Sequence, residues 1–366
     1  MAIGIFIVIL LGLILVHEFG HFSVAKVFGI RVEEFGIGFP PKLFGIKKGE
    51  TEYTVNALPF GGFVRIFGED QHSAALSPAD ANRSFVAQPK LVQVAVLVAG
   101  VGMNIITAWI LLTVGYGIGL PADSSSYPQY AISDSHVTVI TVAPQSPAEG
   151  AGILAGEQFV RIQAQTGSFL ESDALADDVR HFIAQHGGEA LTITLSRGGA
   201  ERTVVATPAE GLIPEGRALG VVLEDVGILR LPAHLALVEG GKLTLSLTKE
   251  TVVGLANFFA TLVRGNADFA SVAGPVGIVG VVDEASQFGT AALIMLAAII
   301  SINLAIINLI PFPALDGGRV VMVGVEAITG RPISRSFFAW TSGVGFGLLI
   351  LLMIVITYHD ILRLFA

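Results

Sequence analysis

The sequence predicts a polytopic α-helical membrane protein with one inserted α+β domain. Of its 366 residues, 52% are hydrophobic and only 14% are charged, whereas ordinary globular proteins have about 25% charged residues. The deficit is concentrated in four stretches, at 1–16, 91–120, 290–312 and 339–357. A membrane helix needs about 20 apolar residues, and the first stretch reaches that length if it continues to about Ala25. We therefore expect four transmembrane helices.

The N-terminal stretch is predicted to be a retained helix. It has no Lys or Arg before Lys26 and no small-residue cleavage pattern after the apolar run, so it lacks the features of a signal peptide. The absence of cysteine excludes disulfides and thiolate metal ligands.

Positive charges predict the orientation, because cytoplasmic loops carry the excess of Lys and Arg. Both the first loop and the short third loop are basic: Lys26, Arg31, Lys42, Lys47, Lys48, Arg65, Arg83 and Lys90 in the first, and Arg319, Arg331 and Arg335 in the third. Both should be cytoplasmic, which leaves the two termini and the segment between spans two and three outside the cytoplasm.

The long segment between spans two and three accounts for most of the net charge of −9. From 118 to 288 there are 19 acidic and 9 basic residues, which argues against binding to nucleic acid or to anionic lipid. Strand-like alternation, an amphipathic helix over "DALADDVRHFIAQHGG" and a Gly-Gly hairpin turn predict one small α+β domain. We expect a membrane core over 1–120, this domain over 121–235, and an amphipathic segment with the second membrane core over 236–366.

The first loop is rich in Gly, Pro and Phe and has the alternating stretch "TEYTVNAL", which predicts β-hairpins. Two interpretations stay open on the pattern alone. The hairpins either form a small cytoplasmic core or dip into the membrane, where protein or a water-filled cavity would satisfy their backbone.

The motif "HEFGH" lies at the end of the first apolar run. His17 and His21 are four residues apart, so they share one face of a helix and suit two imidazole ligands on one zinc ion, with Glu18 placed to take a proton from water. An unpaired carboxylate in hydrocarbon is costly, which makes an intramembrane glutamate a functional hypothesis. The structural alternative is a polar cluster that reaches the cytoplasmic interface.

A catalytic zinc ion usually has three protein ligands. The best candidate for the third is Asp316 in "NLIPFPALDGGR", just after span three, because it lies between two prolines and two glycines that break the local helix. His136, His181 and His186 of the soluble domain are expected on the other side of the membrane. The alternative role for Asp316, which the pattern leaves equally open, is to cap the following helix.

These motifs together resemble the site-2 protease family and, within it, the bacterial RseP-type branch of regulated intramembrane proteolysis. The likeness rests on HEFGH, on Gly100 and Asn104 in span two, and on N-x-x-P-x-x-x-L-D-G from Asn308 to Gly317. "LPFGGFVRIFGED" resembles the membrane-associated β-hairpin loop of that branch, "SPAEGAGILAGEQFVRIQA" its PDZ domain, and "VAGPVGIVG" the segment before span three. Two departures are Val101, where the family commonly has Pro, and room for one PDZ domain instead of two.

The resemblance implies a zinc-dependent endopeptidase that cuts transmembrane segments of single-span proteins, such as anti-sigma factors or remnant signal peptides, in the bacterial inner membrane. It makes His17, His21 and Asp316 the zinc ligands and Glu18 the base. Asn104 would stabilise the oxyanion or hold the substrate backbone, and Asn308 would support the site. The hairpin loop around Gly61, Gly62 and Phe63 would pair with the unwound substrate as an added strand. The PDZ-like domain would contact clients or gate access.

Two other functions fit the same residues. A divalent-metal transporter would use His17, Glu18, His21 and Asp316 as a transit site, but the other spans offer few further ligands. An inactive homologue would bind membrane clients through its PDZ-like domain, although every expected catalytic position is present in this chain.

Overall fold

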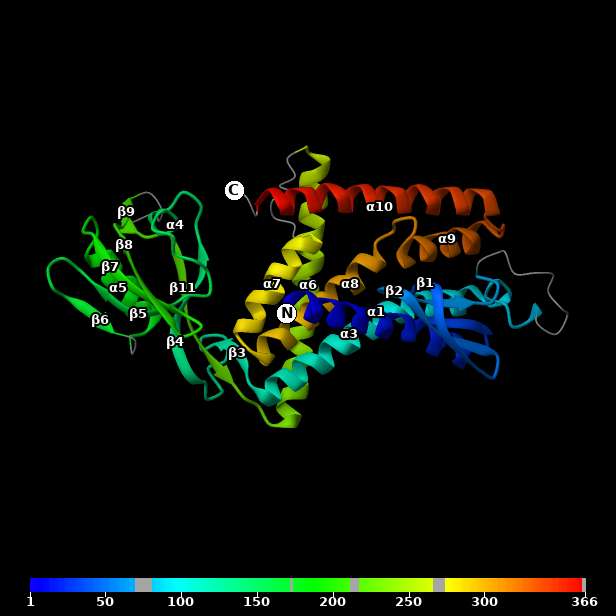
Figure 1. The fold of residues 1–366 in the computed structure, drawn as a ribbon, viewed down its shortest axis with the longest axis horizontal. Coiled ribbons are helices and arrows are strands. Elements are labelled where there is room, and N and C mark those ends of the chain that lie inside the picture. Colours follow the sequence, from blue (N-terminus) through cyan, green and yellow to red (C-terminus); the bar gives the residue numbers. More distant parts are fainter. Residues whose placement is uncertain (70–80, 172–173, 211–216, 266–273, 364–366) are drawn as a thin grey trace. The chain divides into compact units, whose positions relative to one another are not determined.

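The computed structural model describes residues 1–69, 81–171, 174–210, 217–265 and 274–363 (Figure 1). The chain forms two compact units. Unit 1 comprises Met1–Val114 and Ala233–Ala366, and unit 2 comprises Gly115–Pro232. Unit 2 is therefore an insertion in unit 1, and each unit is described by itself.

Four helices correspond to the predicted spans: α1 (Ala2–Val27), α3 (Lys90–Ile118, whose last residues belong to unit 2), α8 (Thr290–Leu309) and α10 (Arg335–Arg363). Among the described residues, these are the helices long and apolar enough to cross a membrane, so the prediction of four is confirmed. The first helix continues without a break through the HEFGH motif. It ends where Gly29 adopts a φ of +73° and Ile30 donates a backbone hydrogen bond to Ala25, the pattern of a Schellman cap.

The loop after α1 forms strands β1 (Val32–Lys48) and β2 (Thr51–Ile66). The first part of β1 has partners on both sides, because Ile37 lies opposite Val55 in one register and opposite Gly62 in the other. The strand segments therefore lie in the order 42–48, 51–58, 32–39 and 62–66. Among the described residues, segment 62–66 pairs on one side only and forms an edge of this small antiparallel sheet.

Among the described residues, unit 1 also contains the helices α6 (Ala233–Val263), α7 (Pro275–Gln287) and α9 (Asp316–Thr329) and the short 3-10 helix η1 (Phe85–Ala87). The predicted amphipathic segment is thus two separate helices, and part of "VAGPVGIVG" lies outside the described residues. The N-terminus of α7 is capped by Asp360 of α10, whose buried carboxylate accepts hydrogen bonds from the backbone N–H groups of Gly274 (3.2 Å) and Gly277 (2.8 Å).

Helices α3 and α6 meet where the chain leaves unit 1 and where it returns. The indole of Trp109 donates a hydrogen bond of 2.8 Å to the carbonyl oxygen of Leu237. The contact is close: if Gly240 carried a Cβ atom, as alanine does, that atom would lie only 2.7 Å from the hydroxyl oxygen of Thr113. Glycine lets two helix backbones approach in this way.

Unit 2 has an antiparallel sheet in the order β3-β11-β4-β5-β7-β8, with β6 beside β5. Its buried core includes Val139, Ile162, Phe182, Ile193 and Leu223. The Gly-Gly turn between β7 and β8 and the amphipathic helix α5 are both present as predicted. The elements are β3 (Leu120–Asp123), β4 (Ser133–Val142), α4 (Pro147–Gly150), β5 (Gln158–Gln163), β6 (Phe169–Glu171), α5 (Ala176–Gln185), β7 (Leu191–Arg197), β8 (Ala200–Ala206), β9 (Ala209–Glu210), β10 (Arg217–Ala218) and β11 (Val221–Leu229).

Candidate active site

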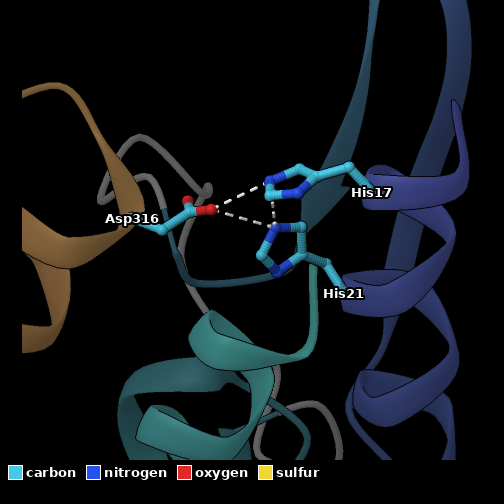
Figure 2. A group of neighbouring side chains, drawn as sticks. All are labelled: His17, His21 and Asp316. Atoms are coloured by element: carbon cyan, nitrogen blue, oxygen red, sulfur yellow. Dashed lines mark hydrogen bonds and ion pairs between the residues drawn. The ribbon is translucent and has the colours of Figure 1, made fainter. Parts of the chain in front are cut away.

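Helix α1 presents His17 and His21 from one face, one turn apart (Figure 2). Both side chains are buried, with relative exposures of 7% and 8%, in a helix whose other residues are almost all apolar. A buried imidazole needs polar partners, and the two histidines find them in one another and in residues of distant segments.

Asp316 reaches the histidines from the first turn of α9, 299 residues along the chain from His17. The turn before it is tight: Cβ atoms on Gly317 and Gly318 would lie 2.2 Å from the carbonyl oxygens of Leu309 and Phe312. Only glycine leaves room for the backbone to fold back so closely. The N-cap of α9 is Leu315, so the Asp316 carboxylate faces the histidines and does not serve as the helix cap.

The three side chains bring one ligand atom each to a common point (Figure 2). His17 Nε2 lies 3.0 Å and His21 Nε2 lies 3.3 Å from Asp316 Oδ2, and the two nitrogens are 3.2 Å apart. Tetrahedral zinc with bonds of about 2.0–2.1 Å places neighbouring ligand atoms about 3.3 Å apart. Two imidazoles and one carboxylate are also a donor set that zinc accepts at catalytic sites. The residues therefore fit a zinc ion in both spacing and chemistry.

The hydrogen bond of His21 on its other ring nitrogen sets its tautomer. Nδ1 lies 2.8 Å from the carbonyl oxygen of Val96, which can only accept, so Nδ1 carries the proton. Nε2 is therefore the ring nitrogen of neutral His21 whose lone pair is available to a metal ion. Second-sphere bonds of this kind orient metal-ligating histidines.

The Asp316 carboxylate is held in its ionised form. Burial by itself raises the pKa of Asp316, but the hydrogen bonds with His17 and His21 outweigh burial and hold this pKa well below its usual range. An ionised carboxylate is the form that binds a metal.

Helix α3 fits against α1 through glycine. A Cβ atom on Gly20 would lie 2.4 Å from the carbonyl oxygen of Ala99, and one on Gly100 would lie 2.4 Å from His21 Nε2. Asn104, one turn beyond Gly100, is fully buried, and its amide lies 3.3 Å from His17 Nδ1. The motif residues of span two therefore face the histidines, and Val101 is part of an unbroken helix.

A cavity of about 220 Å³ opens beside the ligand group. Glu18 and Asn308 both line it, so the predicted base and the predicted supporting amide face one space. The lining residues are Ile14, His17, Glu18, Asn104, Leu304, Asn308, Ala314, Leu315 and Asp316.

The edge segment of β2 lies next to this group. A Cβ atom on Gly62 would lie 3.2 Å from the side chain of Leu15 and 3.5 Å from that of Glu18. Gly61 and Phe63 both face Phe39. The Phe39 ring is the nearest group to a Cβ atom added at Gly61, and the same ring stacks on the ring of Phe63.

Several parts of the site carry no signal in the sequence. The Val96 partner of His21 is a backbone carbonyl, which any residue could supply. Gly20 lies inside HEFGH but its role depends on a helix 80 residues away. Ala314 lines the cavity with a φ of +81°, a conformation that costs a non-glycine residue about 1–3 kcal/mol. In the sequence, only the two prolines before Ala314 indicate an unusual turn.

Comparison with known proteins identifies the family of the chain. The profile of Peptidase family M50 matches residues 5–352. A Clostridium perfringens protein with the provisional name zinc metalloprotease is 35% identical over 361 residues, which cover 96% of this chain and 95% of that protein. The zinc metalloproteases RasP of Geobacillus kaustophilus and Bacillus licheniformis are 28% and 29% identical, each over 98% of this chain and at least 97% of their own length. The chain belongs to Peptidase family M50, the site-2 protease family of membrane-bound zinc metalloproteases.

Proposed function

We propose that this protein is an intramembrane endopeptidase that cuts transmembrane segments of single-span proteins, with His17, His21 and Asp316 as its zinc ligands. The observation that carries the proposal is the convergence of these three ligand atoms on helices of unit 1, beside a cavity lined by Glu18. The histidines lie in a helix apolar enough to cross a membrane, so a bond that reaches them lies at membrane depth.

Glu18 is the proposed proton carrier. When bound, zinc supplies Lewis-acid chemistry that lowers the pKa of water to about 7 and polarises a carbonyl group. The Glu18 carboxylate takes a proton from the attacking water and delivers it to the leaving amine. Asn308, which lines the same cavity, offers an amide that can hydrogen-bond to the peptide backbone.

The substrate is proposed to bind as an extended strand along segment 62–66. A transmembrane helix hides its carbonyl groups in internal hydrogen bonds, so it must unwind before hydrolysis. Segment 62–66 pairs on one side only among the described residues, and Gly62 brings this edge to within reach of Glu18. Backbone pairing at the edge would replace the lost helical bonds without demanding a particular sequence.

We further propose that the basic loops face the cytoplasm of a bacterial cell, with both termini and unit 2 on the opposite side of the inner membrane. The support is the distribution of Lys and Arg. Unit 2 is then a PDZ-like domain, as its strand-rich α+β fold supports, and it contacts clients or gates their access. Anti-sigma factors and remnant signal peptides are the substrate classes that the family suggests.

The test is cleavage of a single-span substrate reconstituted with the protein in liposomes. Glu18→Gln should lower the cleavage rate by roughly 100- to 10,000-fold while zinc content stays at the wild-type level. Glu33→Gln, which changes a carboxylate outside the cavity, is the matched control and should cleave normally.

Two results would contradict the proposal. Cleavage that persists in Glu18→Gln would exclude Glu18 as the general base. Zinc flux across the vesicles without cleavage would favour the transporter, in which the same four side chains carry a metal across the membrane.

A further inference from the structure

Asn104 has one polar atom without a partner. Its side chain is fully buried in α3, and its carbonyl oxygen Oδ1 makes no hydrogen bond to any of the described residues. Buried amide oxygens are rarely left unpaired. The other end of the same amide, Nδ2, lies 3.3 Å from Nδ1 of His17.

This contact conflicts with zinc binding by His17. A neutral imidazole has one N–H and one lone pair. If Nδ1 accepts a hydrogen bond from the amide N–H, then Nε2 carries the proton and points it at Asp316, 3.0 Å away. A ligating Nε2 needs the opposite tautomer, in which Nδ1 is protonated and requires an acceptor.

The amide can supply that acceptor by turning over. Its two ends have nearly the same shape, so exchanging them leaves the packing unchanged. The turn would place Oδ1 about 3.3 Å from His17 Nδ1, in the position that Nδ2 occupies, and would pair the orphaned oxygen. The α3 backbone at this point is fixed, because the Ser301 hydroxyl donates a hydrogen bond of 2.8 Å to the backbone carbonyl of Asn104.

We propose that Asn104 is a positioning residue for His17: with zinc bound, its amide oxygen accepts a hydrogen bond from Nδ1–H and holds the Nε2 lone pair on the metal. The two histidines are then oriented by two different acceptors of α3, the Val96 carbonyl for His21 and the Asn104 side chain for His17. This inference rests on the proposed ligand set. It replaces a role for Asn104 as a donor to the oxyanion.

Substitutions at Asn104 separate an acceptor from a donor. Asn104→Leu has a similar shape and no polar atom, and it should weaken zinc binding about 10- to 100-fold. Asn104→Asp keeps an acceptor and should retain wild-type zinc affinity and most of the cleavage rate. Zinc affinity is measured by competition with graded chelator, on purified protein in detergent. The visible absorption of the Co²⁺-substituted protein is a second readout, which should change in Asn104→Leu and not in Asn104→Asp.

The control is Asn303→Leu, which removes an amide of α8 that pairs with Thr251 and not with a histidine. Its zinc affinity and Co²⁺ spectrum should match the wild type. If Asn104→Leu fails to fold, Asn104→Asp still decides the matter, because a carboxylate cannot donate to an oxyanion. Loss of cleavage in Asn104→Asp with unchanged zinc affinity would overturn the inference.

His17→Ala distinguishes a failure of the proposed zinc ligand set from a failure of the positioning role proposed for Asn104. If His17→Ala retains full zinc affinity, the proposed ligand set is wrong. If His17→Ala loses zinc while Asn104→Leu binds it normally, the ligand set stands and the role assigned to Asn104 is wrong.

Discussion

Glycine at positions 20 and 100 sets the distance between α1 and α3. At each position the neighbouring helix leaves no space for a single methyl group: the nearest atom to an added Cβ is a backbone oxygen at Gly20 and a histidine nitrogen at Gly100. A backbone atom cannot move aside as a flexible side chain can. The ligand geometry therefore depends on the absence of side chains as much as on the histidines.

Gly100→Ala should strongly weaken zinc binding. The added methyl group would lie within 2.4–2.8 Å of the rings of His21 and His17, so one or both rings must leave the position that faces Asp316. We expect at least a 100-fold loss in zinc affinity, measured by chelator competition. Gly102→Ala lies on the same helix with no atom within 4 Å of the added group, and its zinc affinity should not change. Normal zinc binding by Gly100→Ala would show that α3 does not constrain the histidines.

At the residue scale, the sequence predicts contacts that are local and misses those that are not. His17, Glu18 and His21 are recognisable because a helix of 3.6 residues per turn fixes their relation within five residues. Asp316 is a candidate ligand from its local turn, but the choice between metal ligand and helix cap needed the family resemblance, since nothing in local spacing links it to α1. The acceptor on Val96 could not be predicted, because a carbonyl group is common to every residue.

At the scale of elements, unit 1 joins α7 to α10 through a buried carboxylate. Asp360 pairs with two N–H groups at the first turn of α7, where the helix has unsatisfied donors and a partial positive charge. The fit is close, since a Cβ atom on Gly274 would lie 2.7 Å from the Asp360 carboxylate.

Asp360→Ala should lower the free energy of local unfolding of α7 by about 1–2 kcal/mol, the usual effect of losing an N-terminal cap. Hydrogen exchange of amides in 274–287 should accelerate about 5- to 30-fold, while α1 and α3 keep wild-type rates. Asp283→Ala, on the exposed side of α7, is the control. Equal exchange in the two variants would contradict a capping role for Asp360.

The turn between β1 and β2 is held by a charge cluster that should respond to acid. Glu50 contacts Lys26 at 2.6 Å and Arg83 at 2.7 Å. Hydrogen bonds from Arg83, and then from Lys26, lower the pKa of Glu50 to about 2 from its ordinary value of 4.5. The folded state therefore binds this proton less readily than the unfolded state, so the stabilisation is complete above pH 4.5 and is lost as the pH falls toward 2.

Thermal unfolding in detergent measures this effect. Between pH 6 and pH 3 the Tm of the wild type should fall more than that of Glu50→Gln, which has no carboxylate to protonate. Glu52→Gln removes a neighbouring carboxylate that pairs with Lys42 and serves as the control. An identical pH response in the wild type and Glu50→Gln would exclude the cluster as the source.

The sequence predicts helices and strands poorly where tertiary contacts determine the strand pairing or the end of a helix. The spans α1, α3 and α8 were predictable because a long apolar run has few alternatives to a membrane helix. The hairpins were predictable from Gly and Pro, but the double pairing of β1 was not, since register in such strands is set by what they pack against. The predicted fourth span ends at 357, where the stretch with almost no charge stops before Asp360, and the sequence does not reveal the N–H groups that pair with this carboxylate.

At the scale of the whole molecule, the ligand group links the two ends of unit 1. His17 and His21 belong to the first helix, whereas Asp316 follows α8, so a bound ion ties segments that are about 300 residues apart. A ligand that binds only the folded state stabilises it by mass action, by about 4 kcal/mol at 1,000 times its Kd.

Removal of zinc should therefore lower the Tm of the entire membrane core. In detergent, a strong chelator should reduce the Tm of the wild type and of Glu18→Gln alike, because Glu18 is not among the three converging ligands. Asp316→Ala should already have the lower Tm and should not respond to chelator. A chelator response in Asp316→Ala equal to that of the wild type would remove Asp316 from the ligand set.

The contact between α3 and α6 has a consequence for the evolution of the inserted unit. The Trp109–Leu237 hydrogen bond and the close approach at Gly240 bring together the point where the chain leaves unit 1 and the point where it returns. The inserted unit between these two points, Gly115–Pro232, therefore begins and ends at neighbouring positions of unit 1. It can be enlarged, shortened or duplicated without altering the register of the helices that carry the proposed zinc ligands, so the inserted unit and the metal site are free to evolve independently.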